Sequence, residues 1–274
     1  MFAAYPLVRN VSAFWTRFGV SRSPSREGSS PSSASSFRIR SCICLFYICA
    51  LAAAAAAQDP DALYAARADP ASAAQAADLW AARLASDPAD FEAAWKIARA
   101  CYWLGSHAPP RERRGYLERG IDAAEKAIAL RSERPEGHFW LAANMGTLAE
   151  SYGISAGLRY RGRIRRELET VLRIDPAFMD GSADRALGRW YHKVPRLFGG
   201  NRRRAEDHLR ASLKYDPYST VSHFFLAELL LDEDRTDEAR RELRAVLDAP
   251  FNPAWAPEDA DYKARARALI ATLD

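Results

Sequence analysis

Beyond residue 58, apolar residues recur every three or four positions in helix-length stretches that stop at or near a proline. The four prolines are Pro88, Pro135, Pro176 and Pro217, separated by 47, 41 and 41 residues. A period in this range is typical of stacked helical hairpins, because one hairpin has an apolar face too large to leave wet and too small to fold alone. The pattern therefore predicts an all-α superhelix and favours binding over catalysis.

The last unit has the clearest spacing. Residues 220–253 span 34 residues, with Leu226 and Ala227 on a first helix and Ala239 and Leu243 on a second. The small residues let the two helices approach closely while the leucines fill the space around them. This is the tetratricopeptide spacing. We therefore predict a right-handed superhelix of tetratricopeptide-like hairpins with enlarged turns inside the hairpins and a C-terminal capping helix.

The other units follow the same plan with longer turns. The predicted parts are a lone capping helix over 72–85, a first hairpin of 91–104 and 116–130, a long turn over 151–162 in the second hairpin, an enlarged turn over 193–201 in the third, and a final helix over 257–273.

The first 57 residues read as a separate leader. Residues 21–37 are rich in Ser, Pro, Arg and Gly, and Arg38 and Arg40 precede an apolar run that ends in alanines 52–57. A basic flank, a short apolar segment and a small-residue end describe a secretory signal peptide. We predict a disordered leader with a signal over 1–57, a solenoid domain over 58–274, and a periplasmic or secreted location after cleavage. The alternative is an uncleaved segment that keeps the protein at a membrane.

Charge and cysteine content narrow the function classes. The chain has 39 basic and 35 acidic residues, and removing six leader arginines and Glu27 leaves 33 and 34. A nearly neutral domain disfavours nucleic acid as a partner. Three of the four cysteines fall in the leader, which leaves Cys101 alone and no disulfide framework.

Three motifs in the second and third units carry a family resemblance. They read His138-Phe139-Trp140-Leu141-Ala142 with Asn144-Met145-Gly146, Ala186-Leu187-Gly188-Arg189-Trp190-Tyr191 with Lys193-Val194-Pro195, and Phe198-Gly199-Gly200-Asn201. With them the chain resembles the TatT family, tetratricopeptide-like components associated with tripartite ATP-independent periplasmic (TRAP) transporters. A weaker similarity links the same elements to the eukaryotic regulators of microtubule dynamics.

The TatT resemblance implies a periplasmic superhelix, lipid-anchored in many members and able to trimerise, that works beside a solute-binding protein. The expected partners are such a solute-binding protein or another envelope complex, a small organic anion, and further copies of the chain. This sequence departs from the family because none of its early cysteines follows a lipobox-like triplet.

Catalysis finds little support in the sequence. The five histidines show no metal-ligand spacing, and neither a nucleophile elbow nor a phosphate loop occurs. His223 occupies a core-facing repeat position, where a structural role is expected, and Cys101 lies on the small-residue stripe of a helix. We expect no enzyme activity, no metal and no cofactor.

The predicted binding site lies on the concave face of the superhelix. Counting along the first helix of each unit places these residues there: Trp95, Arg99, Tyr102, Phe139, Ala142, Arg185, Arg189, His192, Phe224 and Glu228. Aromatic rings beside guanidinium groups suit an elongated organic anion or an acidic peptide. The alternative is that these side chains pack against the long turns and the terminal helix.

Two functions are consistent with these patterns. The first is a periplasmic accessory protein of TRAP-type solute uptake that binds a small acidic or amphiphilic ligand or docks a solute-binding protein. The second is a protein–protein scaffold of the cell envelope without a small ligand. An Arg-lined enclosed pocket beside aromatic residues favours the first, and an open wet groove favours the second.

Overall fold

A computed structural model describes residues 59–152 and 154–273, all of which belong to one compact unit. The predicted leader lies outside the described residues. Regular structure in the described part is entirely helical, as predicted from the spacing. The helices are α2 (Pro60–Ala65), α3 (Pro70–Ser86), α4 (Phe91–His107), α5 (Pro110–Leu130), α6 (Pro135–Ser151), α7 (Ile154–Ile174), α8 (Ser182–Lys193), the short 3-10 helix η1 (Arg196–Phe198), α9 (Arg202–Tyr215), α10 (Thr220–Leu231), α11 (Thr236–Asp248) and α12 (Ala256–Ile270). Within this part of the chain, no helix combines the length and the apolar content needed to cross a bilayer.

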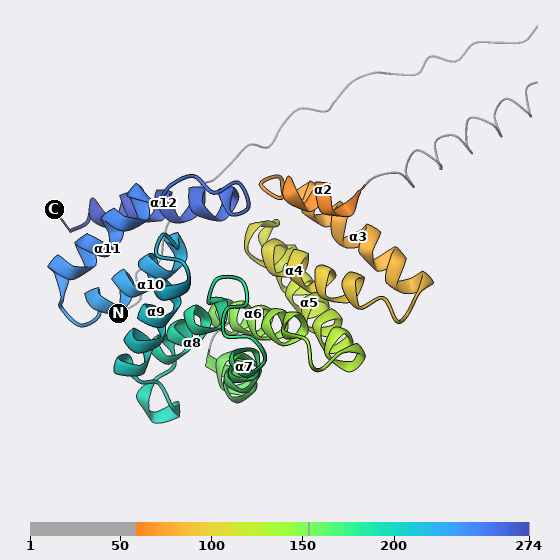
Figure 1. The fold of residues 1–274 in the computed structure, drawn as a ribbon, viewed down its shortest axis with the longest axis horizontal. Helices are drawn as coiled ribbons and strands as arrows, with labels where there is room; N and C mark the ends of the chain where they lie inside the picture. Colours follow the sequence, from red (N-terminus) through yellow and green to blue (C-terminus); the bar gives the residue numbers. More distant parts are fainter. Residues whose placement is uncertain (1–58, 153, 274) are drawn as a thin grey trace, which may run out of the picture. The chain divides into compact units, whose positions relative to one another are not determined.

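Successive helices pair into hairpins that stack side by side. The pairs α4/α5, α6/α7, α8/α9 and α10/α11 are each in contact, and α6, α8 and α10 also pack against the second helix of the preceding hairpin. In the ribbon view α4, α6, α8 and α10 form an inner row while α5, α7, α9 and α11 lie outside them (Figure 1). This is the superhelix of hairpins that the proline period predicts.

Aspartate caps and first-turn prolines mark several helix N-termini in the sequence. Asp59, Asp69 and Asp90 cap α2, α3 and α4 through side-chain oxygens that accept backbone N–H groups. Proline occupies the first turn of α2, α3, α5, α6 and α12, where its missing N–H leaves no bond unmade. The prolines that punctuate the sequence therefore mark helix boundaries.

Fully buried leucines hold each hairpin together. Leu141 and Leu168 lie on α6 and α7, Leu187 and Leu209 on α8 and α9, and Leu226 and Leu243 on α10 and α11, all with at most 1 % of their surface exposed. Because each pair occupies the same register, the hairpins share one packing geometry.

Three predicted segments differ from the structure. In the first hairpin α4 continues to His107 and α5 begins at Pro110, where a helix was expected only from residue 116. The long turn expected over 151–162 is helical from residue 154, so α7 begins earlier than the sequence pattern indicated. The N-terminal cap is a pair of helices, since α2 packs against α3 ahead of the first hairpin. The prediction missed α2 because it has only six residues.

The enlarged turn between α8 and α9 is present as predicted. Gly199 adopts φ 106°, which a side chain would resist, and a Cβ on Gly200 would come within 1.6 Å of the Val194 carbonyl oxygen. Asn201 then caps α9 by accepting the Arg204 N–H at 3.0 Å. The first glycine is needed for its backbone angle and the second for a close approach.

The two ends of the helical unit meet. Arg67, in the linker between α2 and α3, donates to both carboxylate oxygens of Glu258 on α12, at 2.9 and 2.6 Å, and to the Ala254 carbonyl at 2.7 Å. The ribbon shows α2 beside α12 (Figure 1). The last helix thus packs on α10 and α11 and is also tied to the first helices.

Candidate functional site

The arginines of the concave face fall into two groups, those already paired within the protein and one that is not. Arg99 on α4 belongs to the first group. Its guanidinium carbon lies 4.1 Å from the ring centre of Tyr64 and 4.9 Å from that of Trp95, and one nitrogen lies 3.5 Å from the Asp61 carboxylate. Burial lowers the pKa of Arg99, while Tyr64 and Asp61 oppose that shift. Arg99 therefore fastens α2 to α4.

Arg189 on α8 is also occupied. It grips Glu150 at the end of α6 through two hydrogen bonds of 3.1 Å, bonds Glu228 on α10, and lies 4.5 Å over the ring of Phe225. Burial alone would lower the pKa of Arg189, but the two carboxylates outweigh it and raise that pKa. The guanidinium of Arg189, which we predicted to bind a ligand, is thus occupied by Glu150 and Glu228. These bonds link α6, α8 and α10, three consecutive inner helices.

Arg185, one turn before Arg189, is different. Within the described part of the chain its half-buried guanidinium makes no hydrogen bond and no ion pair. Burial lowers its pKa, and the phenols of Tyr102 and Tyr262 are the strongest influences that oppose this. Burial in turn raises the pKa of both tyrosines. An unpaired cation near two phenols has unused capacity to hold an anionic oxygen.

A pocket of about 250 Å³ has Arg185 in its wall. The remaining walls come from the linkers before α8, α10 and α12 and from the first turns of α10 and α12. Two exposed aromatic residues stand in those linkers, Tyr218 with 64 % and Phe251 with 79 % of their surface exposed. Such aromatic residues at a pocket rim are typical anchors for a partner.

The pocket also has acidic walls, so it is not a simple anion site. Four acidic residues line it together with Arg185: Asp180, Asp216, Glu258 and Asp259. Glu258 is neutralised by Arg67, and Asp259 accepts the Thr220 hydroxyl at 2.7 Å. Burial raises the pKa of Asp259 despite that bond. The lining therefore suits a segment that carries a carboxylate next to donor groups.

Several predicted site residues lie in the core or in ordinary contacts. Phe139 and Ala142 are buried, and Phe139 packs edge-on against Phe178 at 5.6 Å. Phe224 is buried beneath α12, with its ring 5.4 Å from Tyr262. All three side chains are covered by the chain's own helices and linkers.

Trp95 and His192 have polar partners of their own. The Trp95 indole donates to Glu92 at 3.0 Å, and a His192 ring nitrogen lies 2.7 Å from the Asp232 carboxylate. Burial and Lys193 lower the pKa of His192. Of the predicted residues, Arg185 lines the pocket. Tyr102 interacts electrostatically with Arg185.

Tyr218 and Phe251, the two exposed aromatic residues at the rim of the pocket, were not among the predicted site residues. Tyr218 follows Asp216-Pro217, and Phe251 stands between Pro250 and Asn252-Pro253. An aromatic residue inside a proline-rich linker has no helical face to pack on, so its side chain is expected to be exposed. This position in the sequence was the signal that could have identified both residues.

Histidine–carboxylate pairs occupy one register in three consecutive hairpins. His138 and His223 each stand three residues before a buried inner leucine and bond Glu167 and Glu242 at 2.6 Å. In the middle hairpin the pair is inverted: Asp184 takes the inner position and His208 the outer one, at 2.7 Å. These histidines hold helices together, as predicted for His223. Among the described residues, no group of three or more His, Cys, Asp or Glu side chains could hold a metal ion.

The pairs predict a pH dependence of stability. His138 bonds Glu167 and the Ser132 carbonyl, and His223 bonds Glu242 and the Pro217 carbonyl, so both ring nitrogens serve acceptors and both rings favour the protonated form. The Glu167 bond raises the pKa of His138. Burial opposes protonation of His223, but its bonds to Glu242 and Pro217 outweigh that and raise its pKa.

A raised folded-state pKa means that the stabilisation is complete below the unfolded value of about 6.5 and is lost as pH rises through the folded value. We expect the stability of the wild type against urea to fall above about pH 6.5 relative to that of the His138→Gln/His223→Gln variant. Parallel pH profiles for the two proteins would contradict the protonated pairing.

Comparisons with known proteins agree with this architecture. The described part of the chain is an all-helical repeat structure of the tetratricopeptide type: residues 199–273 match a tetratricopeptide repeat model, and a thermophilic TPR protein of Thermus thermophilus superposes with a TM-score of 0.58. That structure is 22 % identical, and the match covers 77 % of this chain and 95 % of that one, which supports the fold alone.

Residues 58–206, more than half of the chain, match the model described as regulator of microtubule dynamics protein 1-3, and the chain belongs to this family. Regulator of microtubule dynamics protein 3 of Xenopus laevis is 25 % identical over 154 residues, covering 56 % of this chain and 32 % of that protein. The Rattus norvegicus protein of the same name is 23 % identical over 173 residues, covering 57 % and 36 %. The chain thus spans about a third of the length of these relatives.

Proposed function

We propose that the helical unit is a protein-interaction scaffold whose pocket between α8, α10 and α12 receives a partner segment bearing a carboxylate. The observation that carries this proposal is the unpaired Arg185 in the pocket wall. Its neighbour Arg189 is already paired with Glu150 and Glu228, so Arg185 is the guanidinium of α8 that remains available to a ligand carboxylate.

The aromatic residues at the rim of the pocket favour a polypeptide ligand over a small solute. Tyr218 and Phe251 expose most of their surface on separate linkers, which gives an extended segment two apolar anchors beside one charged contact. A free amphiphilic organic acid is the second occupant to test, since it offers the same carboxylate. The scaffold catalyses nothing under this proposal.

Binding is tested by calorimetry with two probe sets, peptides that end in a free carboxylate next to an aromatic residue and a panel of amphiphilic organic acids. We expect Arg185→Ala to weaken binding by about 1.5–3 kcal/mol, roughly ten- to a hundredfold in Kd. Arg196→Ala removes an exposed arginine that does not line the pocket and serves as the matched control. Binding that is equal in wild type and Arg185→Ala would reject the pocket, and binding confined to the organic acids would replace the peptide.

The location and the partner form a finer part of the proposal. The leader pattern at residues 38–57 and the motifs shared with the TatT family support a periplasmic role beside a TRAP-type solute-binding protein. The names of the curated relatives point instead to microtubule regulation. The two functions require opposite sides of a membrane.

Cleavage of the predicted signal peptide distinguishes the periplasmic function from microtubule regulation. For a secreted protein we expect cleavage at the end of the alanine run, after Ala57 or Gln58, so that the mature chain begins at Gln58 or Asp59. N-terminal sequencing of the extracytoplasmic fraction measures this. An intact leader on a cytosolic protein that sediments with microtubules would favour microtubule regulation and remove the TRAP partner.

A further inference from the structure

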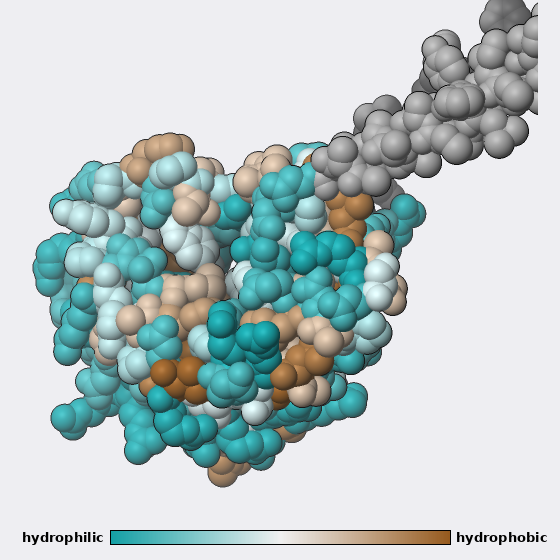
Figure 2. All heavy atoms as spheres, turned by 45° about the vertical axis from the view of Figure 1, so that its right-hand side comes forward, coloured by the Kyte–Doolittle hydropathy of each residue, from teal (hydrophilic) through white to brown (hydrophobic). Residues whose placement is uncertain are grey.

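The turn between α8 and α9, residues 194–201, presents an apolar tip to solvent. Leu197 exposes 87 % of its surface, more than any other large hydrophobic side chain of the described residues, and the adjacent Phe198 exposes 37 %. The face of the molecule shown in Figure 2 is mostly hydrophilic, with hydrophobic side chains gathered in smaller patches. A single exposed leucine is ordinary, so its surroundings decide what it means.

The tip is held in a fixed shape. The Phe198 and Gly200 N–H groups donate to the Pro195 carbonyl at 2.8 and 3.2 Å, and the Asn201 N–H donates to the Tyr191 carbonyl at 2.9 Å. These bonds fix the backbone of the turn, and Leu197 stands at its exposed tip. An ordered turn that keeps two hydrophobic residues exposed fits a surface that buries them elsewhere.

Unpaired arginines surround the tip. Arg196, Arg202 and Arg203 are exposed and make no ion pair within the part of the chain that the structure describes. Arg161 of α7 lies 5.4 Å over the Phe198 ring. Glu206, on the first turns of α9, is taken up by Arg210 and Arg235, so it does not neutralise this group.

We infer that this turn docks the protein onto an anionic membrane surface, with Leu197 and Phe198 entering the headgroup layer and the arginines binding lipid phosphates. The membrane affinity of a protein surface grows with the apolar area it inserts and with its attraction to anionic lipids, and the turn supplies both contributions. A bilayer suits a projecting tip with dispersed charges because it is flat, deformable and uniformly negative. The inference is independent of the pocket, which lies at α8, α10 and α12.

A fluorophore at the tip tests insertion directly. The full chain is prepared with Leu197→Cys and with Cys42, Cys44 and Cys49 changed to Ser, so that an environment-sensitive label attaches at 197 while Cys101 remains buried. We expect a blue shift with vesicles of phosphatidylcholine and phosphatidylserine and none with pure phosphatidylcholine. A label at Phe251→Cys, similarly exposed but in the pocket lining with Asp216 and Glu258, should not shift. No shift at 197 would overturn the inference, and so would a shift with poly-glutamate instead of vesicles.

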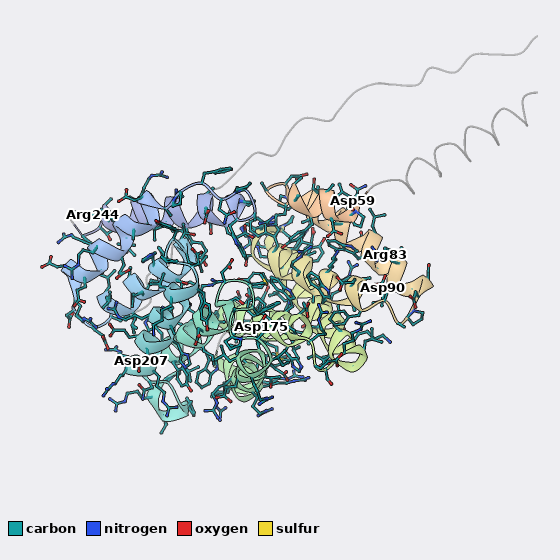
Figure 3. All side chains as sticks on the ribbon, viewed as in Figure 1. Asp59, Arg83, Asp90, Asp175, Asp207 and Arg244 are labelled. Atoms are coloured by element: carbon teal, nitrogen blue, oxygen red, sulfur yellow. The ribbon has the colours of Figure 1, made fainter. Side chains whose placement is uncertain are left out.

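Partition measurements test the charges. Each basic residue near an anionic surface contributes about 1 kcal/mol, roughly fivefold in partition. The full-chain Arg196→Gln/Arg202→Gln/Arg203→Gln variant should therefore lose about a hundredfold of its anionic-over-neutral vesicle preference. Arg241→Gln/Arg244→Gln/Arg267→Gln removes the same charge from exposed sites on α11 and α12, of which Arg244 is labelled in Figure 3, and should keep most of it. Equal losses in both triple variants would show a net-charge effect and contradict a docking site at the turn.

Discussion

Replacing Leu187 by alanine is expected to lower the free energy of unfolding by about 2–5 kcal/mol, because a buried leucine loses its transfer energy and leaves a cavity. Leu187 has 1 % of its surface exposed, on the α8 side of the α8–α9 hairpin. Leu187 belongs to the continuous apolar core, and α8 packs against α7, α9 and α10, so the substitution weakens its own hairpin and the contacts with both neighbouring hairpins. Urea unfolding monitored by circular dichroism measures it.

The same chain offers a matched control ten residues on. Leu197→Ala makes the same chemical change at a side chain that is 87 % exposed, and we expect its unfolding free energy to stay within about 0.5 kcal/mol of wild type. If both variants unfold at the wild-type midpoint, Leu187 is not a packing residue. If both are destabilised equally, the turn contributes to the core.

The repeat register could be predicted because its signals are local. Asp-Pro steps mark the helix boundaries, and small residues such as Ala227 and Ala239 recur where helices touch. The start of α7 could not, since Gly157 and Gly162 argue against a helix by propensity. Packing overrides that preference: the Trp190 indole on α8 donates to the Arg161 carbonyl at 3.0 Å, which fixes this segment against the next hairpin.

The residues of the candidate site were harder to predict from the sequence, because the ion pairs of the arginines join residues far apart in the chain. Arg189 looks free in the sequence because its partners Glu150 and Glu228 each lie 39 residues away, on opposite sides. That separation is close to the repeat period, so an acid one period before or after a concave arginine was the available signal. Arg185 has no acidic residue at either of these separations, where Gly146 and Phe224 stand. The same counting would have separated the paired arginine from the unpaired one.

Replacing Arg67 by alanine should destabilise the unit by about 3–5 kcal/mol, since it leaves Glu258 as a nearly buried carboxylate without its counter-charge. The Arg67 and Glu258 side chains are 7 % and 18 % exposed, and the Arg67 carbonyl also accepts the Trp103 indole at 2.6 Å. Arg83→Ala is the control: its guanidinium is 48 % exposed and lies 2.9 Å from Asp90, and both residues are labelled in Figure 3. Asp90 is itself only 15 % exposed, but it caps α4 and keeps the Ala93 N–H that it accepts at 2.8 Å when Arg83 is removed. Because water can replace this exposed arginine, the pair is worth at most about 1 kcal/mol.

The Arg67–Glu258 contact joins residues 191 positions apart, so its loss should also free the first helices from the last. We expect small-angle scattering of Arg67→Ala to show a larger radius of gyration under conditions where the protein remains helical, and Arg83→Ala to match wild type. The double variant Arg67→Met/Glu258→Leu should recover most of the lost stability, because no unpaired charge is left behind. If the double variant is as unstable as Arg67→Ala, the cost lies in the packing of Arg67 on Tyr64 and Trp103 and not in the orphaned carboxylate.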